Sequence, residues 1–161
     1  MKAGVFMFAN IKIKPLLISI GLALLAGIVS CLLGNSSSGY EELIRPSFAP
    51  DGIVFPIVWI ILYILMGISA YFIYCQQSCK SKNALIFYFV QLIVNSLWTF
   101  FFFGLQMYLF GFWWIILLIV LVSITMFLFY KIKPFSAYLL IPYLIWLIFA
   151  AVLNYNIYLL N

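Results

Sequence analysis

The side chains best suited to bind a ligand in this sequence are three amides set in long apolar stretches. Gln91 and Asn95 interrupt one stretch, and Asn154 interrupts another. A carboxamide that faced hydrocarbon without a partner would cost several kcal/mol. We therefore expect all three amides to face the interior of a helical bundle, where they bind a ligand or form hydrogen bonds between helices.

Helical spacing places aromatic residues on the same faces as these amides. Gln91, Asn95 and Trp98 lie at positions i, i+4 and i+7, which share one face of a helix. Two further faces follow the same rule, and their members are Phe55, Trp59 and Tyr63 in one stretch and Trp146, Ala150, Leu153 and Asn154 in another. These three faces are the candidate walls of a binding pocket.

Acidic and basic side chains are absent from the same stretches. The chain has no histidine, and its acidic and basic residues all lie outside the spans predicted below. General acid–base catalysis needs such a group near the reacting atom, and proton-coupled pumps need one at membrane depth. A conventional hydrolase, ATPase or proton-driven transporter is therefore not expected. We interpret Cys31, Cys75 and Cys79 as structural, and we predict no metal site and no resident cofactor.

Composition assigns the chain to the membrane. Apolar residues make up 68% of its 161 residues and charged residues 7%, and the mean hydropathy is +1.26. A soluble domain carries about 25% charged residues, so lipid must cover much of this surface. The net charge of +5 comes from basic residues that stand singly or in pairs. We interpret them as topological anchors and predict one domain that binds no nucleic acid.

Four charge-free stretches are long enough to cross a bilayer, which takes about 20 apolar residues. The third, 83–130, has room for two helices, because Gly104, Gln106 and Gly111 favour a tight hairpin near 104–108. We predict an all-α bundle of five transmembrane helices, near residues 16–34, 54–76, 84–103, 109–130 and 135–158. Pro142 is expected to kink the last helix.

The first span has two further features. Lysines precede it, which would also suit a cleaved signal peptide, but about 18 apolar residues are long for such a segment. Small residues recur in it at every fourth position, and they are Ser19, Ala23, Gly27 and Cys31. We predict that this stripe is a helix-packing surface.

Basic residues in short loops predict the orientation. Seven of the eight lie on one side of the predicted membrane, and they are Lys2, Lys12, Lys14, Lys80, Lys82, Lys131 and Lys133. Only Arg45 lies on the other side. We therefore predict a multi-pass protein of the cell membrane, bacterial in type, with a cytoplasmic N-terminus and an extracellular C-terminus.

The outer loop, about residues 35–53, is expected to form a lid. It contains all three acidic residues, and Pro46 and Pro50 stiffen it. The candidate walls lie in the outer halves of their spans, directly beneath this loop, at a rise of about 1.5 Å per residue. Together they predict an aromatic pocket that opens outward.

Aromatic belts at the membrane interface are the alternative interpretation of these side chains. Tyr108, Trp113, Trp114 and Tyr158 fit a belt best. Trp59 fits either interpretation, whereas Trp146 lies near the middle of its span, where a belt does not explain it.

Three segments resemble the translocator protein family, also called tryptophan-rich sensory proteins and, in animals, the peripheral benzodiazepine receptor. They are RPSFAPDGIVFPIVWIILYILMG (45–67), VQLIVNSLWTFFFFG (90–104) and IPYLIWLIFAAVLNYNI (141–157). The strings P-S-x-x-P, W-x-x-L-Y-x-x-M-G and P-Y-L-x-W-x-x-F-A-x-x-L-N carry the resemblance. With the five spans and the outer loop, it extends over nearly the whole chain.

The resemblance implies a five-helix bundle, commonly a homodimer, that binds tetrapyrroles such as protoporphyrin and benzodiazepine-receptor ligands. It implies ligand contacts at Trp59, Asn95, Trp98, Trp146, Ala150 and Leu153. To these we add Phe55 and Tyr63 from helical spacing, and Tyr40 and Phe48 from the loop. Animal members bind cholesterol through a segment of the form L/V…Y…R/K, whose basic residue VLNYNIYLLN lacks.

Three functions are compatible with such a pocket. The first is a tetrapyrrole receptor that promotes light-driven oxidative breakdown of protoporphyrin, as the resemblance implies, with Trp59 and Trp146 as the oxidisable residues. The second is transport of tetrapyrroles or similar lipophiles, although the sequence shows no inverted repeat. The third is a sensory or regulatory protein whose pocket reports its ligand.

Overall fold

The computed structural model describes residues 11–34, 40 and 43–161, and these form helices and loops with no strand. Five helical segments are long and apolar enough to cross a membrane, which confirms the predicted fold. They are α1 (Ile13–Gly34), α3 (Val54–Tyr74), α4 (Cys79–Thr99) with the π-helical segment η2 (Phe100–Gly104), α5 (Tyr108–Ile132), and α6 (Pro134–Tyr138) with α7 (Ile141–Leu160). Lys2, Glu41, Glu42 and part of the predicted lid lie outside the described residues.

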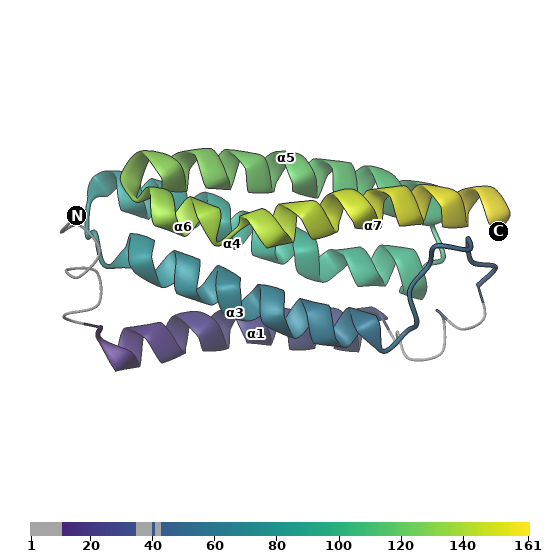
Figure 1. The fold of residues 1–161 in the computed structure, drawn as a ribbon, viewed down its shortest axis with the longest axis horizontal. Coiled ribbons are helices and arrows are strands. Elements are labelled where there is room, and N and C mark those ends of the chain that lie inside the picture. Colours follow the sequence, from purple (N-terminus) through teal and green to yellow (C-terminus); the bar gives the residue numbers. More distant parts are fainter. Residues whose placement is uncertain (1–10, 35–39, 41–42) are drawn as a thin grey trace.

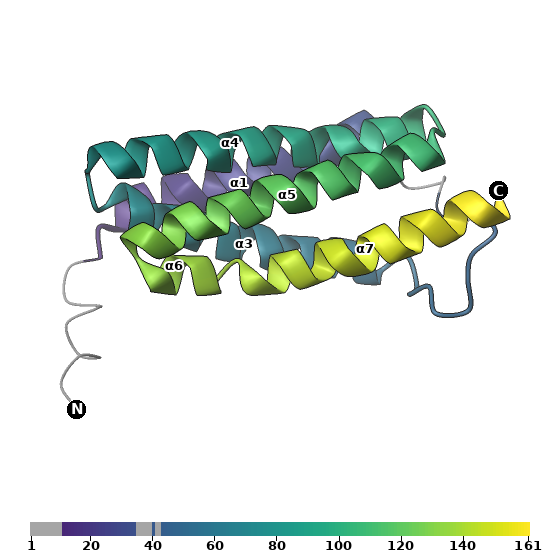
Figure 2. The same cartoon turned by 90° about the horizontal axis from the view of Figure 1, so that it is seen from above.

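The helices run side by side along the long axis of the molecule (Figure 1). α1 packs against α3 and α4, and α5 packs against α4 and α7. The loop that precedes α3 lies at the same end of the bundle as the C-terminus, and α1 begins at the other end, called here the N-terminal end of the bundle (Figure 2). The described lysines lie at the N-terminal end, where α1 and α4 begin and α5 ends, and they are Lys12, Lys14, Lys80, Lys82, Lys131 and Lys133.

The contact between α1 and α3 depends on glycine. A Cβ atom at Gly67 would lie 2.5 Å from Ile20 Cα, and one at Gly27 would overlap the ring of Tyr63. Ser19 Oγ donates a hydrogen bond of 2.8 Å to the Gly67 carbonyl. The two backbones therefore approach as closely as small residues allow in membrane helix pairs.

The small-residue stripe of α1 is confirmed as a packing surface at Ser19, Ala23 and Gly27, but not at Cys31. Ala23 is fully buried, whereas Cys31 is exposed. The reason is that the contact passes from α3 to α4 near the end of α1, where Thr99 Oγ1 donates to the Ser30 carbonyl at 2.5 Å. A stripe drawn at fixed spacing does not follow this change of partner.

The fifth span is interrupted at the point where a kink was expected. α6 ends at Tyr138, residues 139–140 form a turn, and α7 begins at Ile141. Leu140 N–H donates to the Ala137 carbonyl at 3.0 Å, which closes the end of α6. Pro142 lies in the first turn of α7, where its missing N–H has no carbonyl to pair with. The interruption thus removes the backbone conflict that would have bent a continuous helix.

The predicted hairpin between the third and fourth spans is confirmed. In η2 the Leu105 N–H donates to the Phe100 carbonyl at 2.9 Å, the i→i−5 bond of a π-helix. Gln106 then takes a φ of 53°, which lets the chain reverse before α5. Gly111 lies within α5, and the space left by its missing side chain is occupied by Phe102, which is buried.

A buried chain of hydrogen bonds links α3, α4 and α7. The Tyr63 hydroxyl donates to Asn95 Oδ1 at 2.6 Å, and Asn95 Nδ2 donates to the Tyr143 hydroxyl at 2.9 Å. The Tyr143 hydroxyl donates in turn to Gln91 Oε1 at 3.0 Å. All four side chains are buried, which confirms that both amides of α4 face the interior. Gln91 forms a hydrogen bond between helices, one of the two roles left open for it.

We expect Gly67→Ala to destabilise the bundle by about 1–3 kcal/mol, because the added methyl meets the backbone of α1 rather than a mobile side chain. Thermal unfolding in detergent measures this effect. Gly21→Ala is the matched control, since a Cβ there meets nothing within 4 Å. Equal melting temperatures for the two variants would contradict the close contact between α1 and α3.

We expect Asn95→Leu to destabilise the protein by about 1–3 kcal/mol, because the buried hydroxyls of Tyr63 and Tyr143 each lose a partner. The same unfolding assay applies. Asn156→Leu is the control, because the Asn156 amide donates only to the Val152 carbonyl of its own helix in the described hydrogen bonds. If Asn95→Leu melted at the same temperature as the control, the buried hydrogen bonds of Asn95 would not be holding the helices together.

Candidate ligand-binding site

Aromatic rings connect α3 and α7 in the half of the bundle beneath the loop. The Phe55 and Trp146 ring centroids lie 5.8 Å apart in an edge-to-face contact. Trp59 lies 6.0 Å from Tyr143 and stacks on Tyr63 at 5.5 Å. Both tyrosines belong to the buried hydrogen-bond chain, so Trp59 rests directly on that chain. These rings meet in the space between α3 and α7, and a flat ligand that binds there must separate them.

Trp98 lies on the α4 side of the same region. It stacks on Phe102 with ring centroids 4.9 Å apart. It also packs against two buried clusters, one that contains Leu153 and one that contains Ala150. Trp98 therefore joins α4 to the face of α7 that carries Trp146.

Three buried polar atoms in this region have no hydrogen-bond partner among the described residues. They are Trp98 Nε1, Trp146 Nε1 and Asn154 Oδ1. Asn154 Nδ2 donates to the Ala150 carbonyl of its own helix at 2.8 Å, so the amide faces the interior as expected but makes no described bond to another helix. Buried polar groups are nearly always paired, and leaving one unpaired costs about 1–3 kcal/mol. The region thus offers two donors and one acceptor, all neutral, to a group from outside the chain.

The loop lies over this region and contacts both of its walls. The Tyr40 ring lies 4.9 Å from the Phe55 ring of α3, and the Tyr40 hydroxyl donates to the Pro50 carbonyl at 2.8 Å. The Phe48 ring lies 6.4 Å from the Phe149 ring of α7. The guanidinium of Arg45 lies 5.0 Å from the centre of the Tyr40 ring. The described part of the loop is therefore attached to α3 and to α7.

The structure brings most of the predicted site residues together in three contact groups. Tyr40, Phe55 and Trp146 form the first, Trp59, Tyr63 and Asn95 the second, and Trp98, Ala150 and Leu153 the third. Phe48 lies at the edge and is half exposed.

Tyr143, Phe149 and Phe102 also belong to the region, and the sequence reasoning missed them. Tyr143 lies three residues before Trp146, on the same helical face, so spacing alone could have found it. Phe102 lies four residues after Trp98 and continues that stripe. Phe149 is placed by its contact with the loop, which no helical period predicts.

The belt interpretation divides among the other aromatic residues. The Trp113 side chain is 60% exposed, as a lipid-facing belt residue would be. Trp114 Nε1 instead donates to the Val94 carbonyl at 2.7 Å and ties α5 to α4. Tyr108 packs on Phe102, with ring centroids 5.2 Å apart.

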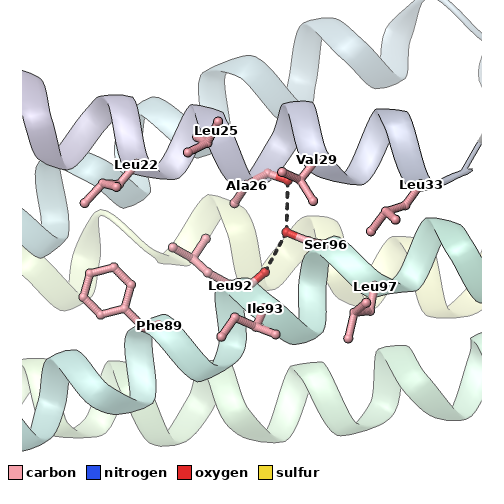
Figure 3. A pocket seen from close by; sticks show the side chains of 10 residues that line it. All are labelled: Leu22, Leu25, Ala26, Val29, Leu33, Phe89, Leu92, Ile93, Ser96 and Leu97. Atoms are coloured by element: carbon pink, nitrogen blue, oxygen red, sulfur yellow. Dashed lines mark hydrogen bonds between the residues drawn. The ribbon is translucent and has the colours of Figure 1, made fainter.

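Two apolar grooves lie elsewhere on the bundle. One, of about 310 Å³, runs between α1 and α4. Figure 3 shows its apolar walls, which include the ring of Phe89, and the Ser96 hydroxyl hydrogen-bonded to the Ala26 and Leu92 carbonyls. The other, of about 370 Å³, lies between α5 and α7 and includes Phe112 and Tyr155. Neither includes a tryptophan. The described residues contain no group of three His, Cys, Asp or Glu side chains placed to hold a metal ion.

Comparison with known proteins identifies one family over most of the chain. Residues 19–160 match the TspO/MBR family. Tryptophan-rich protein TspO of Chlorobaculum tepidum is 33% identical over 94% of this chain and 99% of its own length. Protein CrtK of Rhodobacter capsulatus is 37% identical over 76% of this chain and 78% of its own, and the Translocator protein of Sus scrofa is 32% identical over 89% and 90%. With its five membrane-spanning helices and these relatives, the chain belongs to the TspO/MBR family of membrane proteins.

Proposed function

We propose that this protein is a membrane receptor for flat aromatic ligands, tetrapyrroles such as protoporphyrin foremost, and for benzodiazepine-receptor ligands. The ligand lies between α3, α4 and α7, beneath the loop. One observation carries the proposal: Trp98 Nε1, Trp146 Nε1 and Asn154 Oδ1 are buried and have no hydrogen-bond partner among the residues that the structure describes. A ligand that forms hydrogen bonds with these atoms removes the free-energy cost of leaving them unpaired in the ligand-free protein.

The surroundings of these atoms indicate the chemistry of the ligand. Indole and phenyl rings supply large apolar faces on which a flat ring system stacks. The described charged side chains within the spans are Lys14, Lys80, Lys82 and Lys131, and all four lie at the end of the bundle away from the loop. The described residues around the candidate site are uncharged, so the buried part of the ligand is neutral. Charged substituents, such as the propionates of a porphyrin, stay near the loop, where Arg45 provides a cation.

Trp59 and Trp146 are the residues we assign to light-driven breakdown of a bound porphyrin. An illuminated porphyrin is an oxidant and indole is a readily oxidised side chain, and dioxygen serves as the terminal oxidant. This reaction needs no general acid or base. Both indoles lie at the junction of α3 and α7, each within 6.0 Å of another aromatic ring of the region.

The finer localisation is part of the same proposal. We place the protein in the cell membrane as a homodimer, with its N-terminus in the cytoplasm and the loop outside. The support is the clustering of the described lysines at the N-terminal end of the bundle, which is the cytoplasmic pattern of membrane proteins.

Illumination of the double variant Trp59→Phe plus Trp146→Phe with bound protoporphyrin tests the reaction. We expect at least about a tenfold slower loss of porphyrin absorbance, because phenylalanine is much harder to oxidise than indole, while dark binding weakens less. Trp113→Phe is the matched control, since its exposed side chain lies outside the site. Unchanged degradation in the double variant would remove the tryptophans from the reaction.

Transport is the second candidate, and the interrupted fifth span favours it. Transporters build their sites from discontinuous helices, and relatives of this chain from Sus scrofa and Homo sapiens bear the name Translocator protein. Here the described chain has one interruption, at residues 139–140, rather than a symmetric pair. We expect sealed vesicles that contain the protein to bind protoporphyrin without accumulating it in the lumen. Saturable accumulation that protein-free vesicles lack would favour transport over the receptor.

A further inference from the structure

We propose that Asn161 is a latch that holds the loop closed over the candidate site and so sets the rates at which a ligand enters and leaves. This inference rests on the proposed function and adds to it a regulating residue and a route of entry. The ligand enters from the outer surface beneath the loop, rather than sideways from the lipid between two helices.

The latch is one carboxamide that binds both backbone groups of a single loop residue. Asn161 Nδ2 donates to the Ile44 carbonyl at 3.0 Å, and the Ile44 N–H donates to Asn161 Oδ1 at 3.1 Å. A carboxamide carries a donor and an acceptor side by side, so it matches a peptide group as a neighbouring strand would. Asn161 Nδ2 also donates to the Ile157 carbonyl at 3.0 Å, which orients the side chain on the end of α7.

The latch lies where it can limit access of a ligand to the candidate site. The loop contacts α3 through the Tyr40 and Phe55 rings, and it contacts α7 through Phe48 and Phe149 at one point and through Ile44 and Asn161 at another. The candidate site lies between these two helices. A ligand that arrives from outside must therefore detach the loop from one helix, and the contact with Asn161 is hydrogen-bonded but exposed.

The chemistry of the latch suits a contact that opens often. Its two hydrogen bonds to Ile44 are neutral and exposed, so together they change an opening equilibrium by about three- to tenfold. The contacts of the Tyr40 ring with Phe55 and of the Phe48 ring with Phe149 do not involve Asn161, so they still favour the closed position of the loop. Opening and closing then affect entry and exit alike, and the affinity for the ligand changes little.

Two measurements on Asn161→Ala test the latch. The first is hydrogen exchange of the Ile44 amide in the ligand-free protein, which we expect to be about three- to tenfold faster than in the unmodified protein. The second is stopped-flow binding of protoporphyrin in the dark, followed by tryptophan fluorescence. We expect the association and dissociation rates each to rise about three- to tenfold, with a change in Kd of less than about twofold.

Two further variants sharpen the comparison. Asn156→Ala is the control, because it removes the same side chain from the same end of α7 but breaks only a described bond to that helix. It should leave the Ile44 exchange and both ligand rates unchanged. Asn161→Asp keeps the acceptor for the Ile44 N–H and removes the donor to the Ile44 carbonyl, so its ligand rates should lie between those of the unmodified protein and of Asn161→Ala.

The outcomes separate the latch from the receptor. Unchanged Ile44 exchange in Asn161→Ala overturns the latch, whatever the ligand does. Faster exchange with unchanged ligand rates overturns the gating role and shows that the ligand enters between helices. Faster exchange in a protein that binds no protoporphyrin overturns the proposed function, and the gating role with it, while the contact between the loop and α7 stands.

Discussion

The arrangement of this protein depends on the pairing of polar groups in a bundle interior where the described chain has no charge. Tyr63, Asn95, Tyr143 and Gln91 satisfy one another in a single directed chain from α3 through α4 to α7. Lipid and apolar side chains offer no alternative partners at this depth, so a displaced member leaves a neighbour unpaired. This requirement holds the three helices in register, and it supports the rings above it, because Trp59 rests on both tyrosines.

In the candidate site the pairing of buried polar groups is incomplete. Directly above a fully described chain of hydrogen bonds, Trp98, Trp146 and Asn154 each keep one buried atom without a partner among the described residues. Elsewhere among the described residues, the Tyr88 hydroxyl and Ser136 Oγ are also buried without a partner, whereas other polar side chains are paired. Trp114 reaches the Val94 carbonyl, and Ser69 reaches the Ser136 carbonyl. The three unpaired atoms of the candidate site are distinguished by lying close to the same aromatic rings, and this is why we propose that a ligand binds in the outer part of α3, α4 and α7.

Much of this structure could be predicted from the sequence, because a bilayer imposes a few strict physical constraints on a chain that crosses it. Apolar length defines the five spans, and the cost of unpaired amides turns Gln91 and Asn95 inward. Local backbone chemistry was harder to predict. The break before Pro142 depends on where α6 ends, and the exposure of Cys31 depends on the change of partner from α3 to α4. Long-range contacts such as that of Asn161 with Ile44 join segments far apart in the chain, and no helical period encodes them.

A dark titration of the solubilised protein with protoporphyrin tests the central claim most directly, with porphyrin absorbance and tryptophan fluorescence followed in the same samples. The two signals report on the ligand and on the indoles of the site. We predict saturable binding of one porphyrin per chain, with both signals reaching half of their change at the same concentration. A linear, unsaturable change in absorbance with no matching loss of tryptophan fluorescence would show that porphyrin only partitions into the micelle and that α3, α4 and α7 do not enclose a binding site.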